Sequence, residues 1–488
     1  MYDITIIGAG VVGCAIAREL SKYDLKILLL EKTDDVSNGA SKANSGIVHG
    51  GYAAKHGTLK SKLCFEGNKM YDQLNNELNF GFKRTGALVL GFDEEDEKNI
   101  NKLYENGLKN GVDKKDIKII YKDEILNLEP NVSKNVKIAL LANDVGITSP
   151  YEMTIALAEN AIKNGVELKL ENEVINIEEF SDYFNIITTQ NTYKSRYIIN
   201  AAGVYSDKIS NMLGINDFHI IPRKGQYIIF HKGYGKIINR VIFQTPTNKG
   251  KGILVTPTFH GNLMIGPNAD EISNKEDVTT DIETLKYIIK TAKKSVPNID
   301  LRKVLTSFSG IRPTPSTGDF IIKEAKERFI NVAGIESPGL TSSPAIAKMV
   351  IGILKNSGLN LTKKNDFDPY RNPIIIPKKL SYKEVNKMLE INSDEQIICR
   401  CEMVSKKEII DALNRGIPIK SIDSVKRRTR VTMGFCQGEF CIPRVKKVIA
   451  ETLNIKEDDV PVREKKSGIL PKKVNLNYFK SIFDNKLQ

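Results

Sequence analysis

The stretch DITIIGAGVVGCAIAREL, residues 3–20, decides how this chain starts to fold. Its apolar residues and glycines predict a strand over Asp3–Gly8, a helix over Val11–Lys22, and then a second buried strand over Lys26–Glu31. A strand, a helix and a strand within about thirty residues make one βαβ unit. The chain therefore begins as a Rossmann-like α/β domain.

Three glycines at the first turn form a dinucleotide-binding fingerprint: Gly8, Gly10 and Gly13. The first permits a tight turn, the second lets the backbone approach a pyrophosphate, and the third lets the helix pack on the strand. The positive end of the helix then faces the phosphates. Glu31 closes the second strand, where it can accept hydrogen bonds from ribose hydroxyls. We therefore expect a dinucleotide cofactor.

Two later stretches favour a flavin over a nicotinamide. The loop GASKANSGIVHGG, residues 39–51, consists of small residues that can skirt a flat ring system. The stretch YIINAAGVYSD, residues 197–207, indicates a buried strand that ends on a glycine turn. No second G-x-G-x-x-G occurs in the sequence, so no nicotinamide site is expected.

With these motifs, residues 1–355 resemble the FAD-dependent oxidoreductase family that includes D-amino-acid oxidase, glycine oxidase and glycerol-3-phosphate dehydrogenase. SGIRP at 309–313 and AGIESPGLT at 333–341 belong to the same resemblance. The resemblance implies a Rossmann-like FAD-binding domain. It also implies that FAD contacts Gly8, Gly10, Gly13, Glu31, Lys32, Ser41, Asn44, Ser45, Gly46, Val174, Gly203, Gly310, Gly339, Leu340 and Thr341.

A second, interleaved domain is expected to carry the substrate. Alternating apolar residues at Gln226–His231, Val241–Gln244 and Ile253–Thr256 indicate an antiparallel sheet. Before it, Leu59–Leu78 is expected to form one helix with a polar face. The fold class is thus α/β plus α+β.

Within that family, NSGIVHGG at 44–51 and KGILVTPT at 251–258 resemble glycerol-3-phosphate oxidases and dehydrogenases and L-2-hydroxyglutarate dehydrogenases. The resemblance implies that His49 takes the substrate hydroxyl proton and that Lys251 and Arg312 hold an anionic group. The residue types suit these roles. Histidine titrates near neutral pH, and the planar fork of arginine matches carboxylate or phosphate oxygens.

Four cysteines form two close pairs near the C-terminus, in CRC at 399–401 and CQGEFC at 436–441. Thiolates in such pairs indicate a metal or iron–sulfur site. The pattern resembles the bacterioferritin-associated ferredoxin type of [2Fe-2S] domain, although standalone ferredoxins of that type have a shorter second pair. A structural zinc is the alternative, but C-x-C is unusual for zinc. The expected ligands are Cys399, Cys401, Cys436 and Cys441.

These motifs divide the chain into four parts. Residues 1–355 form the flavoprotein part, 356–394 a linker, 395–455 a small helical cysteine domain, and 456–488 a basic tail. The formal net charge is +13, and much of the excess lies beyond Cys399. Cations near a cluster offset its negative charge, so nucleic-acid binding is not expected. The basic stretches at 426–430 and 444–447 are expected to face an acidic docking surface.

The sequence has no apolar run of eighteen residues and no basic leader before its first apolar segment. We therefore expect a cytoplasmic protein without a transmembrane segment, with possible peripheral membrane association through partners. A flavin domain followed by a cluster domain resembles the large catalytic subunit of anaerobic glycerol-3-phosphate dehydrogenases. That resemblance implies oxidation of sn-glycerol 3-phosphate to dihydroxyacetone phosphate, with electrons passed through the cluster to a partner subunit. The alternatives are an L-2-hydroxy-acid dehydrogenase such as that for L-2-hydroxyglutarate, and an electron-transfer or regulatory flavoprotein with no small substrate.

Overall fold

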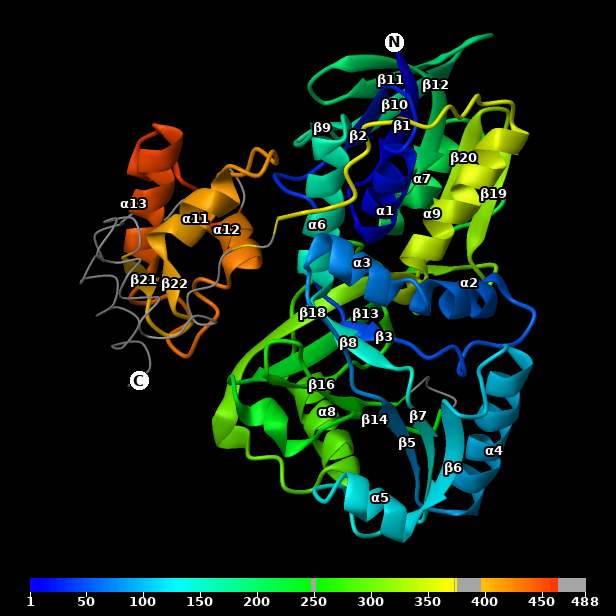
Figure 1. Cartoon of the computed structure of the whole chain (residues 1–488), viewed down its shortest axis with the longest axis vertical. Coiled ribbons are helices and arrows are strands. Elements are labelled where there is room, and N and C mark those ends of the chain that lie inside the picture. The colour runs from blue at the N-terminus through cyan, green and yellow to red at the C-terminus, as the bar shows by residue number, and fades with distance from the viewer. Residues whose placement is uncertain (247–251, 373, 375–395, 464–488) are drawn as a thin grey trace, which may run out of the picture. The chain divides into compact units, whose positions relative to one another are not determined.

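The contacts within the chain divide it into two units (Figure 1). The N-terminal unit comprises Met1–Ile375 and includes the short stretch Asn414–Pro418. The cysteine unit comprises Ile376–Leu413 and Ile419–Gln488. The computed structural model describes residues 1–246, 252–372, 374 and 396–463.

A mostly parallel sheet forms one layer of the N-terminal unit. Its middle strands β12, β1 and β2 lie side by side and parallel, with β20 and β9 continuing the sheet on either side. This confirms the predicted βαβ unit, because α1 (Val11–Leu20) connects β1 to β2. The strands of this sheet are β1 (Tyr2–Ile7), β2 (Ile27–Leu30), β9 (Glu167–Lys169), β10 (Val174–Glu179), β11 (Phe184–Thr188), β12 (Thr192–Asn200), β19 (Ile321–Lys326) and β20 (Phe329–Ala333).

Helices cover this sheet. α1 packs against both α6 (Pro150–Lys163) and α9 (Gly339–Asn356), and the three lie together in the upper part of Figure 1. Small residues in α1 make this packing close, since Gly13, Cys14 and Ala17 are buried. α7 (Ser206–Asn211) packs against β20.

A second, mostly antiparallel sheet forms the other layer, and the two layers are interleaved along the chain. Three of its strands precede β9 and the rest follow β12, after which β19 and β20 return to the first sheet. β14 and β5 pair in parallel, the exception to the predicted antiparallel pattern. The strands are β5 (Ala87–Gly91), β6 (Ile117–Tyr121), β7 (Ile138–Ala142), β13 (Ile220–Phe230), β14 (Val241–Gln244), β15 (Leu254–Pro257), β16 (Leu263–Gly266), β17 (Asp270–Glu271) and β18 (Val304–Pro315).

The second sheet is covered by α4 (Glu94–Lys109), α5 (Lys122–Leu128) and α8 (Ile282–Ser295), whose apolar residues join its core. A small third sheet contains β3 (Ile47–Val48), β8 (Gly146–Thr148) and β4 (Phe82–Arg84). β3 belongs to the loop predicted to skirt a flat ring. That loop is therefore held by strand pairing and is not a free connection.

The single helix predicted over 59–78 is wrong, because the chain forms two helices there. α2 (Leu59–Asn68) ends and α3 (Tyr71–Leu78) begins after a break at Lys69 and Met70. Near the break, α2 packs against the start of α9, and a side-chain Cβ at Gly67 would lie 2.2 Å from the carbonyl oxygen of Thr341. The backbones can approach this closely only because Gly67 has no side chain.

The cysteine unit is a small helical domain with one short hairpin. β21 (Ile397–Cys399) pairs with β22 (Val404–Ser405), and α11 (Lys406–Leu413), α12 (Ile422–Thr429) and α13 (Ile442–Leu453) pack against one another. Its core is apolar and closed, with Ile409, Val425, Val445 and Ile449 fully buried. The helices thus supply a rigid base for the cysteine loops.

The described part of the predicted linker is anchored to the N-terminal unit. The Arg371 side chain donates to the Glu159 carboxylate over 2.6 Å, and the two side chains are only 8% and 5% exposed. The Arg371 amide also donates to the Glu77 carbonyl. On the surface of the same helix α6, Lys163 pairs with Asp368. The predicted linker beyond residue 374, up to 394, lies outside the described residues.

Replacing Arg371 by methionine should destabilise the N-terminal unit strongly. Removing Arg371 leaves the buried Glu159 carboxylate with only the more distant Arg415, 3.6 Å away, and losing a partner of a buried ion pair costs up to about 3–5 kcal/mol. Lys163→Met is the matched control, because it removes an exposed ion pair to the same segment, worth about 1 kcal/mol or less. Thermal unfolding followed by circular dichroism should show a Tm lowered by several degrees for the first variant alone. Equal Tm values for both variants would contradict this account.

Candidate active site and cluster site

The first turn of the chain is a cradle that only glycine backbone can form. Gly8 has a φ of +106°, and a Cβ there would lie 2.5 Å from the carbonyl oxygen of Ala201. A Cβ at Gly13 would lie 1.9 Å from the carbonyl oxygen of Gly8. At Gly10, the nearest neighbour of such a Cβ is the Ser41 hydroxyl, at 3.2 Å. This hydroxyl also accepts the Val11 amide over 2.8 Å, so Ser41 borders the turn.

Glu31 is tied to the same turn. One of its carboxylate oxygens accepts the Ala9 amide over 2.9 Å, and the other accepts both the amide and the hydroxyl of Thr33. A carboxylate oxygen has two lone pairs. The oxygen bonded to Ala9 therefore keeps capacity to accept a further hydroxyl donor.

Three other predicted cofactor residues, Lys32, Val174 and Gly203, lie in different surroundings. Val174 is buried in β10, and Gly203 has a φ of +58° after β12, consistent with its predicted turn. Lys32 instead lies over the Tyr205 ring, 4.0 Å from its centre, and pairs with Glu276 over 3.5 Å. Burial, followed by the hydrogen bond to Glu276, raises the pKa of Tyr205 well above its usual value. Lys32 is thus already engaged by protein groups.

The loop after Ser41 is held in a fixed shape. The Asn44 side chain donates to the carbonyls of Ala40 and Ser41 and accepts the Gly46 amide over 2.9 Å. Gly46 has a φ of +64° and lies against the Thr148 carbonyl, while Ser45 between them is half-buried. These contacts fix the backbone that leads into β3 and His49.

The strand β18 approaches this loop through Gly310. A Cβ at Gly310 would lie 2.1 Å from the carbonyl oxygen of Ala43, so two segments distant in sequence meet backbone to backbone. Beside it, the Ser309 hydroxyl is buried and has no hydrogen-bond partner in the described part of the chain. A buried hydroxyl without a partner is costly, and a bound polar group would relieve that cost. The glycine cradle, the Glu31 carboxylate and this hydroxyl together fit a bound dinucleotide.

His49 follows β3 and is held at its backbone by the start of α9. Its amide donates to the Thr341 hydroxyl over 2.9 Å, although the two residues are 292 positions apart. Its ring nitrogen Nε2 lies 3.5 Å from the Ser337 hydroxyl, and Phe243 lies alongside the ring. Gly339 begins α9, and the carbonyl of Leu340 accepts the Tyr71 hydroxyl over 2.6 Å. The structure thus brings the predicted residues His49 and Thr341 into contact.

Asn68 was missed by the sequence reasoning and holds the other side of the His49 backbone. Its side-chain amide donates to the carbonyls of His49 and Asp144, each over 2.9 Å. Arg84 braces Asn68, donating to its side-chain oxygen over 2.8 Å and to its carbonyl over 3.1 Å. No sequence motif marks Asn68. The only signal is that it is a buried polar residue at the end of a helix, which is visible only in the fold.

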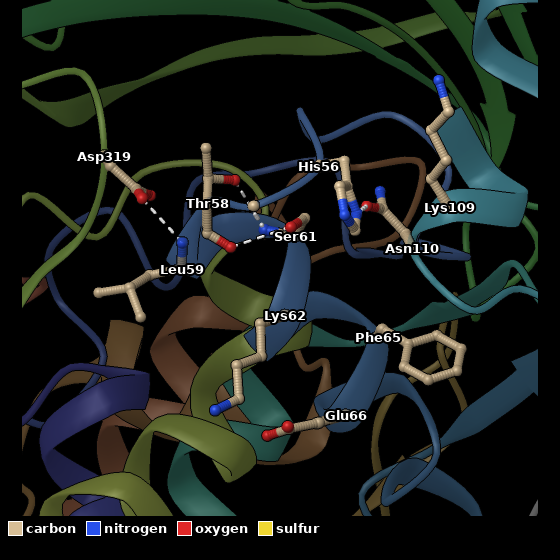
Figure 2. A pocket seen from close by; sticks show the side chains of 11 residues that line it. His56, Thr58, Leu59, Ser61, Lys62, Phe65, Glu66, Lys109, Asn110 and Asp319 are labelled. Atoms are coloured by element: carbon tan, nitrogen blue, oxygen red, sulfur yellow. Dashed lines mark hydrogen bonds between the residues drawn. The ribbon is translucent and has the colours of Figure 1, made fainter. Parts of the chain in front are cut away.

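A cavity lies beyond His49, where the chain enters α2 (Figure 2). His56, Thr58 and Lys62 line it, and Asp319 points at the start of the helix. The Asp319 carboxylate accepts the amides of Leu59 and Lys60 over 2.7 and 3.1 Å. These first amides of α2 are therefore already used and are not free donors for an anion.

Arg312 lies on β18, directly opposite Arg223 of β13. Its guanidinium donates to the Asn268 carbonyl over 3.0 Å and lies against Gly225, where a Cβ would come within 2.6 Å. Burial raises the pKa of the neighbouring Tyr227, and the charge of Arg312 opposes that rise. Lys251, the other predicted cation, lies outside the described residues.

The four predicted cysteine ligands form two thiol pairs, and each pair joins the two sequence motifs. The sulfurs of Cys401 and Cys436 are 3.8 Å apart, and Cys399 shares a hydrogen bond with Cys441. This bond, together with backbone amides of Thr432 and Glu402, lowers the pKa of Cys399 and favours its thiolate. The pKa of Cys441 is raised, because its thiol is the donor to Cys399.

Backbone amides also approach the second motif. The amides of Phe440 and Gly438 donate to the Cys436 sulfur and lower its pKa, although burial opposes this. Within the described residues, no three His, Cys, Asp or Glu side chains converge on a single metal-ion position. Two thiol pairs suit two irons with two ligands each, whereas a structural zinc needs four ligands around one ion. The thiol arrangement therefore fits a [2Fe-2S] cluster better than zinc.

The prediction that residues 426–430 face a docking partner is wrong. The side chains of Arg427, Arg428 and Arg430 are buried, and Arg430 pairs with the buried carboxylate of Glu402 over 3.1 Å. Burial also lowers the pKa of Lys426. Lys426 and Arg427 also pair with Asp423 of α12, so these cations are matched by carboxylates of the cysteine unit and do not form an exposed basic patch.

Comparison with known families identifies both parts of the chain. Residues 3–352 match the family of FAD dependent oxidoreductases, and residues 397–451 match the BFD-like [2Fe-2S] binding domain. The chain belongs to the FAD dependent oxidoreductase family. Its N-terminal unit binds FAD, and its cysteine unit is a [2Fe-2S] binding domain.

Comparison with individual relatives narrows the type of oxidoreductase. The chain is 48% identical to a glycerol 3-phosphate dehydrogenase of Caloramator mitchellensis, over 96% of this chain and 98% of the relative. It is 34% identical to a glycerol 3-phosphate oxidase of Mycoplasma genitalium, over 76% of this chain and 98% of the oxidase. The structure of an L-alpha-glycerophosphate oxidase of Mycoplasma pneumoniae with FAD bound aligns with a TM-score of 0.73 and 32% identity, over 76% of this chain and 98% of that one. The chain is a flavoenzyme of the glycerol-3-phosphate dehydrogenase type.

None of the helices in the described ranges is long and apolar enough to cross a membrane.

Replacing Asn68 by alanine should slow flavin reduction by substrate about 10- to 100-fold, because His49 loses the donor that fixes its backbone. Asn106→Ala is the matched control: its amide braces the carbonyls of Tyr52 and Ala54 in the same loop but does not touch His49. Stopped-flow absorbance would measure flavin reduction, with FAD content and Tm measured alongside. If both variants slow reduction equally, Asn68 serves only the stability of the loop.

Proposed function

We propose that this enzyme oxidises sn-glycerol 3-phosphate to dihydroxyacetone phosphate and passes the electrons through its [2Fe-2S] cluster to a partner protein. The observation that carries the proposal is the 48% identity to a glycerol 3-phosphate dehydrogenase over 96% of this chain. A match of that length spans both the flavin site and the cysteine unit.

His49 is proposed to remove the hydroxyl proton of the substrate. Bound FAD supplies a hydride acceptor for the carbinol carbon, so oxidation requires that the hydroxyl lose its proton in the same region. Histidine ionises near neutral pH and can take that proton at Nε2. The bonds from Thr341 and Asn68 keep the His49 backbone in place while the proton moves. The nearby Ser337 hydroxyl can orient the ring.

Arg312 is proposed to hold the anionic end of the substrate. Its bond to the Asn268 carbonyl uses one edge of the guanidinium and leaves other donors for phosphate oxygens. Arginine offers paired donors that match phosphate geometry. Lys251 is proposed as the second cation, on the sequence motif alone.

The cysteine unit is proposed as the exit for electrons. The Mycoplasma genitalium oxidase uses 98% of its length to match 76% of this chain, whereas the Caloramator dehydrogenase matches 96% of it. The relative called an oxidase thus lacks a counterpart to much of the C-terminal region. An enzyme that passes both electrons from flavin to oxygen has no use for a one-electron centre. A cluster therefore favours a protein acceptor over oxygen.

Anaerobic addition of glycerol 3-phosphate should bleach the visible flavin absorbance of the purified enzyme, while L-2-hydroxyglutarate should not. The enzyme should carry FAD and about two irons per chain. Cys436→Ser should lose the cluster absorbance and still bleach with substrate, because flavin reduction needs only the N-terminal unit. Bleaching by L-2-hydroxyglutarate alone would favour a hydroxy-acid dehydrogenase. Bleaching by neither would favour an electron-transfer flavoprotein.

Alanine substitutions at His49 and Arg312 should affect different quantities. The first should change the rate of flavin reduction, and the second the affinity for substrate. His49→Ala should slow flavin reduction about 10²–10⁴-fold with little change in substrate affinity, because a proton acceptor acts in the transition state. Arg312→Ala should weaken substrate binding about ten- to a hundredfold, because a charged hydrogen bond is lost. The dependence of the reduction rate on substrate concentration gives both quantities. If His49→Ala lowers only the affinity for substrate and leaves the limiting rate of flavin reduction unchanged, His49 is a binding residue.

A further inference from the structure

Two phenylalanine side chains of the cysteine unit stand in solvent. Phe435 is 80% exposed and Phe440 is 73% exposed, the highest values for any large apolar side chain in the described ranges. Met403, in the turn after Cys401, is 41% exposed. Scattered apolar residues on a surface are ordinary, but adjacent exposed aromatics mark binding surfaces. We call Met403, Phe435 and Phe440 the aromatic rim.

The residues of the aromatic rim lie close in sequence to the accessible half of the cysteine site. Cys401 is exposed and Cys436 is partly exposed, whereas Cys399 and Cys441 are only 1% and 3% exposed. Phe435 directly precedes Cys436, and the amide of Phe440 donates to the Cys436 sulfur. The two phenylalanines thus flank the thiol pair through which solvent, or a partner, reaches the site.

The loop that carries the two phenylalanines of the rim is fixed before any partner binds. The Gln437 side chain donates to the Gly434 carbonyl over 2.9 Å, and the Glu439 amide donates to the Cys436 carbonyl. Gly434 lies against Cys401, where a Cβ would come within 2.2 Å of the cysteine Cβ. A rigid loop loses little entropy on binding, so its exposed aromatics can serve as anchors.

The charged side chains beside the cysteine motifs indicate which kind of protein the aromatic rim can bind. Arg400 and Arg444 are exposed beside the two cysteine motifs, and neither makes an ion pair with another described residue. Glu439 is the one exposed carboxylate within the CQGEFC motif. A second copy of this chain, with a net charge of +13, would repel such a surface. An acidic protein would be attracted to it.

We infer that the aromatic rim, with Arg400 and Arg444, docks a separate electron-accepting protein whose redox group is surrounded by apolar residues and an acidic border. Electron transfer slows steeply with distance, so the surface over the accessible thiols is where an acceptor must sit. This inference rests on the proposed function, in which the cluster is the exit for electrons. It adds the residues that recognise the acceptor.

The test uses two haem proteins of opposite charge as probes: the acidic haem domain of cytochrome b5 and the basic cytochrome c. Binding of oxidised enzyme to oxidised cytochrome b5 at low salt is measured by calorimetry, so no turnover is involved. The double variant Phe435→Ala/Phe440→Ala should bind about 10- to 100-fold more weakly, as expected for aromatic anchors. Tyr121→Ala is the control, because Tyr121 is 64% exposed on β6 and far from the cysteines in sequence.

Turnover measured with two electron acceptors distinguishes a docking role of the aromatic rim from a role in substrate oxidation. With glycerol 3-phosphate, the double variant should reduce an artificial one-electron dye at the wild-type rate and cytochrome b5 at a rate at least about tenfold lower. Arg400→Glu/Arg444→Glu should weaken cytochrome b5 binding and strengthen cytochrome c binding, both less so at high salt. Cluster absorbance must persist in every variant.

Three results would overturn the inference. The first is unchanged binding of cytochrome b5 to the double variant. The second is equal binding of both haem proteins by the wild type. The third is loss of cluster reduction by glycerol 3-phosphate in the double variant, since the rim would then serve transfer from the flavin. A wild-type enzyme that reduces no dye with glycerol 3-phosphate would instead contradict the proposed function, and the binding measurements would still decide whether the rim docks an acidic protein.

Discussion

The close backbone contact between Gly13 and Gly8 determines how the strands and the helix pack around the first turn of the N-terminal unit. Because Gly13 has no side chain, α1 packs directly on the turn that ends β1, and its first amides lie beside the cradle. The same turn touches Ala201 at the end of β12 and, through the Ala9 amide, the carboxylate of Glu31. Three strands and a helix therefore converge on one point. A larger residue at either glycine would separate them and remove the space for a pyrophosphate.

The interleaved chain places chemistry from distant segments at that flavin site. His49 is reached after the first strand pair, but its backbone is fixed by Thr341 at the start of the last helix of the unit and by Asn68 on α2. Gly310 similarly brings β18 against Ala43. The links His49–Thr341 and Ala43–Gly310 each span most of the second sheet in sequence while remaining short in space. The N-terminal unit must therefore fold as a whole before the proposed base is held in place.

The sequence predicts the parts of this site that depend on local backbone geometry. The fingerprint and the strand ending in Glu31 follow from glycine spacing and apolar periodicity, whereas the choice of His49 and Thr341 rests on the family resemblance. The break between α2 and α3 was missed because it depends on the approach of Gly67 to Thr341, a contact between segments remote in sequence. Asn68 was missed for the same reason. The buried arginines of α12 were misassigned because charge in a sequence does not show which face of a helix packs inward.

The four thiols of the cysteine unit differ in their exposure, and this difference bears on the proposed electron path from flavin to partner. A flavin accepts two electrons together, whereas an iron–sulfur cluster passes them singly, so the cluster must be reachable on at least one side. Cys399 and Cys441 are buried in the core of the cysteine unit and are held by backbone amides, which favours a stable cluster. Cys401 and Cys436 remain accessible between two exposed phenylalanines. A site with all four thiols buried would lack such an accessible side. In the proposed path, this asymmetry within one small helical domain lets a single site both hold a cluster and pass its electrons to another protein.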